Sequence, residues 1–303
     1  MPLSLEIVEA WRKRAVLSEQ EDLDCFRVFH GYSEGISGVV VDAYGEVAVI
    51  RHTEERSHQA AEIAAILHQQ CGFASVVAKT RRGIPRTILG PAPEPTTMVA
   101  EHGICFGVEL EQPGNPGLYL DARPARRWLI DHSAGRHVLN LFSFTGSLGL
   151  AASVGHAKHV IHVDLQRGAL QRCRENYQAN GIELDSRDTV RGNAYQHMKR
   201  AATSGQRFGG IIVDVPPGLH RGSASSFEGL CALAPHIVSM LAEDGWVLAF
   251  FHHMPASHDE MELEFERSSG VGLASIWRGT SGDDFPETDP TKKLRLSAMV
   301  RSL

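Results

Sequence analysis

Four apolar runs in the sequence are each followed directly by a turn glycine or a polar side chain: Gly146 with its loop, Asp164, Gly192–Asn193 and Asp214. A glycine turn lets the backbone approach a ligand, and a carboxylate at the tip of the next strand can accept hydrogen bonds from a ribose. A spacing of about twenty residues between the two is typical of nucleotide-binding βαβ units. Residues 137–164 therefore predict a strand, a tight turn, a helix and a strand that bind a nucleoside-bearing cofactor. Any βαβ unit needs a turn glycine, however, and a strand-end aspartate could simply cap a helix.

Asn193 and Asp214 add polar groups after the later strands. The amide of Asn193 could pair with an adenine edge, because an amide supplies both a donor and an acceptor. Asp214 could hold a polar reactant, since the following Val215-Pro216-Pro217 lacks backbone donors at its two prolines and stiffens the loop. The alternative for this segment is a rigid turn without a chemical role.

A doubly wound parallel sheet would bring these residues together. Helical and apolar β-like segments alternate in this part of the chain, and strands separated by helices run parallel. We therefore expect an α/β domain over residues 117–303, whose ligand lies at the carboxyl ends of the strands at the switch point. A small α+β domain at 1–97 and a connecting hairpin at 98–116 are expected to precede it.

One helix of this domain is predicted from Leu165, Ala169, Cys173 and Tyr177, which fall at steps of four before an Asn-Gly stop. Cys173 is thereby expected in the core and not as a reagent. The five cysteines of the chain are scattered without paired spacing, which predicts reduced thiols and no metal site.

Composition limits the classes of function. The net charge of −6 over 303 residues argues weakly against a protein that binds nucleic acid over its whole surface. Local basic clusters remain candidates for such binding, although a solvated face is the simpler interpretation of each: Lys79 with Arg81 and Arg82, Arg123 with Arg126 and Arg127, and Lys292 with Lys293 and Arg295. No stretch is apolar enough to cross a bilayer, and the N-terminus lacks the features of a secretory signal, so we expect a cytoplasmic protein that does not bind membrane.

Five segments, taken in order, carry a resemblance to a known family. They are GYSEGISGVVVDAYGEVAVI, EHGICFGVEL, GLYLDARPARRW, VLNLFSFTGSLGLAASVGHAKHVIHVD and FGGIIVDVPPG. Together they resemble the S-adenosylmethionine-dependent methyltransferases of the bacterial 23S ribosomal RNA large-subunit methyltransferase I type, which form 5-methylcytosine. The resemblance covers nearly the whole chain after about residue 24.

The resemblance implies S-adenosylmethionine as the cofactor and the seven-stranded, Rossmann-like methyltransferase form of the doubly wound sheet. It implies that the 142–146 loop wraps the methionine end, that Asp164 binds the ribose and that Asn193 lies beside the adenine. The implied cofactor-binding residues are Tyr119, Asn140, Phe142, Ser143, Phe144, Thr145, Gly146, Asp164, Leu165, Asn193, Ala194 and Asp214. By the same analogy Asp121 lies near the entrance to the site, and the implied substrate-side residues are Arg123, Pro216 and Pro217, with Asp214 also acting in catalysis.

The sequence departs from the family pattern in three places. Residues 1–24 are too short for the RNA-binding PUA module that usually precedes the matched part. The motif after the fourth strand reads Asp-Val-Pro-Pro-Gly, where the family has Asp-Pro-Pro followed two positions later by an aromatic residue. The cytosine enzymes also need a thiolate that adds to the ring, and this chain has His252 where they have cysteine.

His252 is accordingly the second candidate catalytic residue, as a general base or, when protonated, as a ligand for a substrate phosphate. The alternative is a histidine that fills space at the sheet edge. Cys231, the nearest other thiol in sequence, is expected on a helix. If His252 is a base, the methyl-accepting atom should be a nitrogen or oxygen that needs only proton removal, and not carbon 5 of cytosine.

We therefore predict a methyltransferase that acts on RNA, ribosomal by resemblance, without a cysteine adduct. One alternative is a methyltransferase for a small molecule or a protein, which the acidic net charge favours. The other is a cofactor-binding protein without catalysis that recognises RNA or a partner. A homodimer is left open, as is a role of the N-terminal domain as a substrate clamp.

Overall fold

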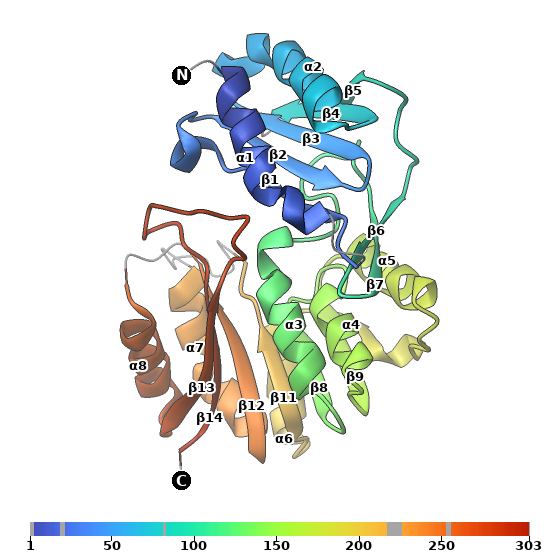
Figure 1. The fold of residues 1–303 in the computed structure, drawn as a ribbon. Helices are drawn as coiled ribbons and strands as arrows, with labels where there is room; N and C mark the ends of the chain where they lie inside the picture. The colour runs from blue at the N-terminus through green and yellow to red at the C-terminus, as the bar shows by residue number, and fades with distance from the viewer. Residues whose placement is uncertain (1–2, 19–21, 81–82, 217–225, 253–255, 303) are drawn as a thin grey trace. The chain divides into compact units, whose positions relative to one another are not determined.

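The structure is a computed structural model that describes residues 3–18, 22–80, 83–216, 226–252 and 256–302. The chain forms two compact units (Figure 1). The first comprises Met1–Leu120 and Gly282–Thr288, and the second comprises Asp121–Ser281 and Asp289–Leu303. The first unit thus takes in the expected hairpin region as well as a segment from near the C-terminus.

The first unit contains a five-stranded sheet in the order β1-β2-β3-β4-β5 and a separate β6-β7 hairpin. Its elements are α1 (Leu3–Ser18), β1 (Cys25–Phe29), η1 (Gly31–Glu34), β2 (Val39–Tyr44), β3 (Val47–His52), η2 (Glu54–Gln59), α2 (Ala60–Cys71), β4 (Ser75–Thr80), β5 (Arg86–Leu89), β6 (Thr97–Glu101) and β7 (Ile104–Val108). Helices α1 and α2 pack together and against this sheet. The unit is therefore the small α+β domain expected ahead of the larger sheet, with the hairpin at its end.

Alternation along β2 separates an apolar face from a charged one. Val39, Val41 and Ala43 belong to the apolar core of this unit. Asp42 points to the opposite face, where its carboxylate is buried and ion-paired with Arg27 and Arg51 at 2.5 Å each. Because successive side chains of a strand point to opposite faces, a single strand supplies both surfaces.

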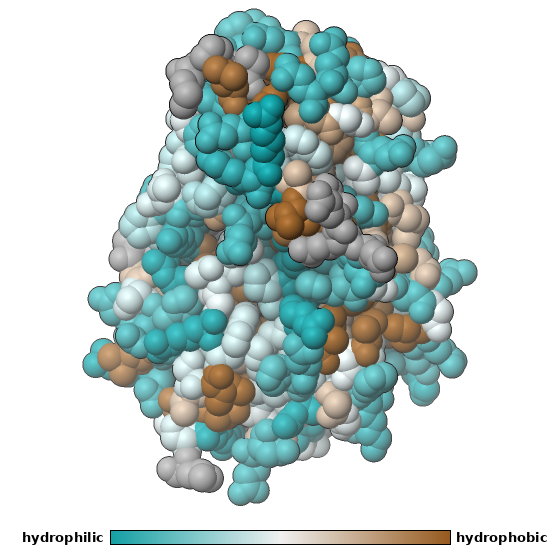
Figure 2. Space-filling model, in the orientation of Figure 1, coloured by the Kyte–Doolittle hydropathy of each residue, from teal (hydrophilic) through white to brown (hydrophobic). Residues whose placement is uncertain are grey.

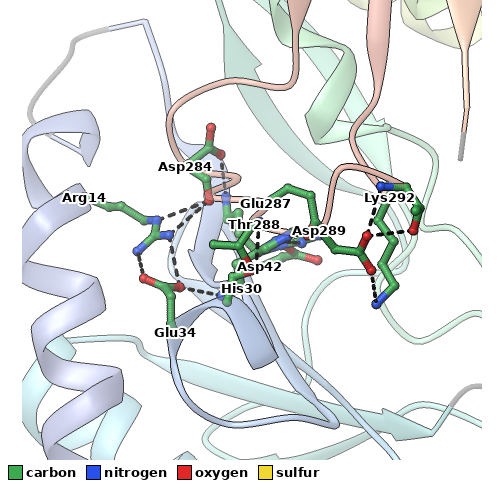
Figure 3. A network of polar contacts seen from close by, with 12 residues as sticks. Arg14, His30, Glu34, Asp42, Asp284, Glu287, Thr288, Asp289 and Lys292 are labelled. Carbon is green, nitrogen blue, oxygen red and sulfur yellow. Dashed lines mark hydrogen bonds and ion pairs between the residues drawn. The ribbon is translucent and has the colours of Figure 1, made fainter. Parts of the chain in front are cut away.

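The segment 282–288 joins the first unit through a network of buried polar contacts (Figure 3). Arg14 of α1 donates two hydrogen bonds to the Glu34 carboxylate, at 2.8 and 3.1 Å, and two to the carbonyl oxygen of Asp284, both at 3.2 Å. The Asp284 carboxylate in turn accepts from the Arg27 backbone N–H at 2.8 Å. This network holds a segment from the far end of the sequence against α1 and β1.

The second unit is a doubly wound sheet of seven strands in the order β10-β9-β8-β11-β12-β14-β13. Its elements are η3 (Leu120–Ala122), which begins at the boundary, α3 (Arg123–His132), β8 (His137–Leu141), α4 (Ser147–Val154), β9 (His159–Asp164), α5 (Arg167–Ala179), η4 (Ser186–Asp188), β10 (Thr189–Arg191), α6 (Ala194–Thr203), β11 (Phe208–Val213), α7 (Ser226–Met240), β12 (Leu241–Phe251), α8 (His258–Ser269), β13 (Leu273–Thr280) and β14 (Arg295–Arg301). Strands β8 to β12 run parallel, and β14 is antiparallel to both of its neighbours. The expected fold class is confirmed.

The helices of this unit cover both faces of the sheet (Figure 1). Helices α3, α4 and α5 pack on one face, and α6, α7 and α8 pack on the other. Leu139 and Leu141 of β8 belong to the apolar core beneath α6 to α8. Asn140, between them, therefore points to the face under α4 and α5.

The surface is mainly hydrophilic on the face drawn in Figure 2, where hydrophobic residues form only small separate areas. Large apolar side chains with more than half of their area exposed include Leu5, Val16, Ile84, Leu165 and Ile276. Scattered apolar residues of this kind are ordinary on a protein surface. Among the described residues, no helix combines the length and apolar character needed to cross a membrane.

Candidate functional site

The candidate site lies where β8, β9, β11 and β12 end. Leu141 of β8 pairs in register with Val163 of β9 and Val213 of β11, and Val213 pairs with Ala249 of β12. Because these strands are parallel, the residues that follow them meet at one edge of the sheet. The strand order reverses between β8 and β11, which is where doubly wound folds bind their ligands.

The loop after β8 has an unusual backbone. Phe142, Phe144 and Gly146 all have positive φ, at 57°, 49° and 77°. This conformation costs a residue with a side chain about 1–3 kcal/mol, so neighbouring structure must hold the two phenylalanines in place. At Gly146 a Cβ atom would lie 2.2 Å from the Cys173 sulfur, so both the backbone and the space require glycine there.

Asp164, at the end of β9, fastens this loop. Its Oδ2 accepts from the Phe144 N–H and its Oδ1 from the Gln166 N–H, both at 2.8 Å. The Ser143 N–H donates to the Val163 carbonyl at 3.1 Å. Each carboxylate oxygen has two lone pairs, so Asp164 can hold these amides and still accept a hydrogen bond from a ligand hydroxyl.

Two buried polar atoms of β8 and its loop have no hydrogen-bond partner within the described part of the chain: Asn140 Oδ1 and Ser143 Oγ. A buried polar atom without a partner costs about 1–3 kcal/mol. A ligand that carries hydrogen-bond donors would remove this cost. Together with Asp164, these atoms fit the amino and hydroxyl groups of S-adenosylmethionine.

The residues expected near adenine lie around the β10–α6 junction. Asn193 is exposed and caps α6, its Oδ1 accepting from the Gln196 N–H at 3.2 Å. The next residue, Ala194, is buried. The cap uses the amide oxygen of Asn193, so its amide nitrogen is the group with which it could meet a base.

Leu165 corrects one detail of the expected helix. It precedes α5, which begins at Arg167, and 57% of it is exposed. The stripe predicted at steps of four is therefore wrong at Leu165, although Ala169, Cys173 and Tyr177 are buried as predicted. The error arises because periodicity shows where a helix lies but not at which residue the strand-end turn gives way to it.

Asp214 and His252 form a hydrogen-bonded pair at the ends of β11 and β12. The Asp214 Oδ1 lies 2.6 Å from the His252 Nε2, and 28% and 23% of the two side chains are exposed. Burial alone would lower the pKa of His252, but the charge and hydrogen bond of Asp214 and the charge of Asp121 together raise it above its ordinary value. The imidazole of this pair therefore keeps its proton to a higher pH than a free histidine does.

The other residues predicted at the site differ in how far they are exposed. Arg123 is buried at the start of α3, and Thr145 is buried within the loop. Pro216 is exposed directly after Val215, whereas Pro217 lies outside the described residues. Tyr119 belongs to the first unit, and 48% of it is exposed.

Cys231 is placed unfavourably for covalent catalysis. It lies on α7, half-buried, and burial raises the pKa of its thiol to about 11. A thiolate is the reactive form, so Cys231 is protonated at neutral pH. His252, and not a cysteine, occupies the end of β12.

Residues under the loop were missed as functional candidates. The Asn176 Nδ2 donates to the Thr145 carbonyl at 3.0 Å, and His162 is buried between Asn140 and Tyr177. The sequence held one signal for them: positions 173, 176 and 177 fall on one face of a helix. The steps of four predict Cys173 and Tyr177 as core residues of a helix and assign no role to Asn176.

The fold and this site define a protein of the doubly wound α/β class whose candidate site lies at the carboxyl ends of its strands. A family model described as S-adenosylmethionine-dependent methyltransferase matches residues 43–300. The chain belongs to this family.

One curated relative is similar to this chain in sequence, and two solved structures are similar to it in fold. The chain is 30% identical over 217 residues to "Ribosomal RNA large subunit methyltransferase I" of Erwinia tasmaniensis, across 68% of this chain and 55% of the relative. It is also similar to a protein of Streptococcus mutans described as a SAM-dependent methyltransferase, with a TM-score of 0.88 and 21% identity over 98% of this chain and 81% of the other. A protein described as a methyltransferase and solved in complex with SAH has a TM-score of 0.87 and 22% identity, over 98% of this chain and 82% of the other. The chain spans just over half the length of the curated relative.

Proposed function

We propose that this chain transfers the methyl group of S-adenosylmethionine to RNA, with ribosomal RNA as the substrate class, and that His252 removes the proton of the accepting atom. The observation that carries the catalytic part is the Asp214–His252 hydrogen bond at the strand ends beside the 142–146 loop. The substrate class is supported by the ribosomal RNA methyltransferase relative. The cytoplasmic location and the homodimer stay predictions.

In this proposal the loop and its neighbours hold the cofactor. Asp164 accepts from the ribose, while Asn140 Oδ1 and Ser143 Oγ accept from donors of the methionine part. Asn193 offers its amide nitrogen to the adenine. The proposed cofactor-binding set of the second unit is completed by Phe142, Phe144, Thr145, Gly146, Leu165 and Ala194. Tyr119, which belongs to the first unit, stays a prediction from the resemblance. The cofactor supplies an electrophilic methyl group on a sulfonium, so the protein needs mainly to align the acceptor with it.

The dyad then handles the proton. With its Nε2–H donated to Asp214, the neutral imidazole has Nδ1 as its basic nitrogen. A bond forms between the acceptor atom and the methyl carbon, the bond from that carbon to sulfur breaks, and the acceptor's proton passes to His252. Asp214 stabilises the imidazolium that results. Arg123, Pro216 and Pro217 are proposed to face the substrate.

This chemistry suits a nitrogen or oxygen acceptor. Methylation of carbon 5 of cytosine requires a thiolate that adds to the ring, and the raised pKa of Cys231 argues against one there. A nitrogen or oxygen acceptor needs only a base, because its own lone pair attacks the methyl group once the proton is removed. The proposed reaction is therefore N- or O-methylation.

The decisive experiment compares His252→Ala with His58→Ala, a histidine exposed in the first unit. A labelled-methyl assay uses total RNA from cells that lack the protein, and calorimetry measures cofactor affinity. Loss of a general base lowers turnover by about 10²–10⁴-fold, so we expect this loss in His252→Ala alone, with cofactor affinity nearly unchanged. Retained turnover in His252→Ala would rule out the base.

The same assay separates the alternative substrates. The net charge of −6 favours a small molecule or a protein over RNA. Cofactor binding without methyl transfer to any RNA would support that alternative or a protein that binds the cofactor without catalysis. A map of modified positions in ribosomal RNA from a deletion strain would identify the nucleotide.

A further inference from the structure

Helix α5 supports the 142–146 loop through one face. Cys173 and Asn176 lie one turn apart on this face and are both buried. The Asn176 Nδ2 donates to the Thr145 carbonyl at 3.0 Å, and Gly146 rests against the Cys173 sulfur. A hydrogen bond and a close van der Waals contact therefore hold the loop against α5.

A buried chain of hydrogen bonds runs alongside. The Asn140 Nδ2 lies 3.3 Å from His162 Nδ1, His162 Nε2 lies 2.9 Å from the Tyr177 hydroxyl, and that hydroxyl lies 2.8 Å from Ser153 Oγ. Burial lowers the pKa of His162 to about 3, so its ring is neutral at physiological pH. If Asn140 donates to Nδ1, the proton must sit on Nε2 and be donated to Tyr177, which then donates to Ser153.

This order of donors fixes the orientation of Asn140. The amide nitrogen of Asn140 contacts His162, so the amide oxygen Oδ1 points the other way. This oxygen is buried without a partner among the described residues. Gly149 makes room for this arrangement, since a Cβ there would lie 2.3 Å from His162 Cε1 and 3.0 Å from Asn140 Nδ2. The chain of hydrogen bonds thus fixes the direction in which Asn140 Oδ1, a hydrogen-bond acceptor, points.

We infer that Asn176 and the His162–Tyr177 pair are positioning residues, which preform the cofactor-binding loop and orient Asn140 before the cofactor arrives. The inference rests on the proposed function, in which this loop binds S-adenosylmethionine. None of the three residues needs to touch the cofactor. They act through the Thr145 carbonyl and through the Asn140 amide.

A preformed loop has a kinetic consequence. Loss of the restraint adds an ordering cost to cofactor binding, while the Asp214–His252 pair, on other strands, stays unchanged. Cofactor affinity and KM should therefore change, and kcat at saturating cofactor should not. A purely structural role would lower stability without this selective effect.

The first test compares Asn176→Leu, which keeps the approximate side-chain volume but removes the donor, with Gln178→Leu, an exposed position of the same helix. Hydrogen exchange of peptides covering residues 140–150 is followed in the cofactor-free protein, and calorimetry with S-adenosylhomocysteine gives the affinity. We expect faster exchange of the loop amides in Asn176→Leu alone. The loss of one buried hydrogen bond should raise Kd and KM by about tenfold, with kcat within about twofold.

The inference is overturned if loop exchange and Kd in Asn176→Leu match those of Gln178→Leu. Should Asn176→Leu fail to fold, Tyr177→Phe decides, because it removes only a hydroxyl, with Tyr44→Phe of the first unit as its control. Tyr177→Phe should raise Kd by about threefold or more, and an unchanged Kd would overturn the inference. If the wild-type protein binds no S-adenosylhomocysteine, the proposed function fails, whereas the exchange measurement still decides whether the loop is held as inferred.

Discussion

The imidazole Nε2 of His252 lies 2.6 Å from Oδ1 of Asp214, although 38 residues separate them in the sequence. Asp214 directly follows β11 and His252 directly follows β12, and these adjacent parallel strands pair in register up to Val213 and Ala249. The carboxylate stabilises the charged imidazole, and with Asp121 it outweighs burial and raises the pKa of His252. In the proposed function, this contact holds the imidazole of His252 in place as the base.

The pH dependence of turnover follows from this pair. A base must be neutral to accept a proton, so kcat/KM should rise with pH, with a midpoint above the ordinary histidine pKa of 6.5. Asp214→Asn removes the main stabilising charge while burial remains, so the midpoint should shift to lower pH and the maximal rate should fall. NMR titration of His252 in both proteins checks the assignment. An identical midpoint in the two proteins would contradict the pairing.

Acid stability should depend on His162. Its pKa is lowered from 6.5 to about 3 in the folded state, so below pH 6.5 the unfolded chain binds a proton that the folded chain does not. This proton uptake does not affect the free energy of unfolding above pH 6.5. As the pH falls below 6.5, it lowers the free energy of unfolding by about 1.4 kcal/mol per pH unit. Between pH 7 and pH 5, wild type should therefore lose about 2 kcal/mol more than His162→Gln. Urea denaturation at the two pH values measures this, and equal losses would show that His162 does not titrate in this way.

Gly146→Ala should weaken both the fold and the cofactor site. The new methyl group would meet the Cys173 sulfur, and φ of 77° is unfavourable for alanine, with a cost of about 1–2 kcal/mol for the backbone alone. In a Cys173→Ala background the sulfur is gone, so Gly146→Ala should cost less than in wild type. Melting temperatures and S-adenosylhomocysteine affinities of the four proteins form a double-mutant cycle. Strict additivity would show that the two residues do not press on one another.

The network that holds segment 282–288 should dominate the stability of the first unit. Arg14 is 5% exposed, and Arg14→Ala leaves the Glu34 carboxylate without its arginine and the Asp284 carbonyl without two donors. Removal of one partner of a buried ion pair costs about 3–5 kcal/mol. Arg12→Ala, at an exposed position of the same helix, should cost under about 0.5 kcal/mol. Limited proteolysis should cut the 282–288 segment faster in Arg14→Ala alone, and similar digestion of both variants would contradict this role.

The sequence by itself determined the parts that depend on short windows. Apolar runs, turn glycines and helical spacing predicted the alternating strands and helices, and strand ends identified Gly146, Asp164 and Asp214, because parallel strands end at one edge. Periodicity also explains the error at Leu165, because steps of four do not show at which residue the preceding turn ends and the helix begins.

Only the tertiary structure decided which distant groups meet. The Asn176–Thr145 hydrogen bond spans 31 residues, the Asp214–His252 pair spans 38, and the Arg14–Asp284 contact spans 270. These contacts depend on strand order, on helix placement and on the return of the chain after β13, none of which is recorded in local periodicity. Hydrogen bonds act over about 3 Å, so whether two polar residues cooperate is settled by the path of the chain between them.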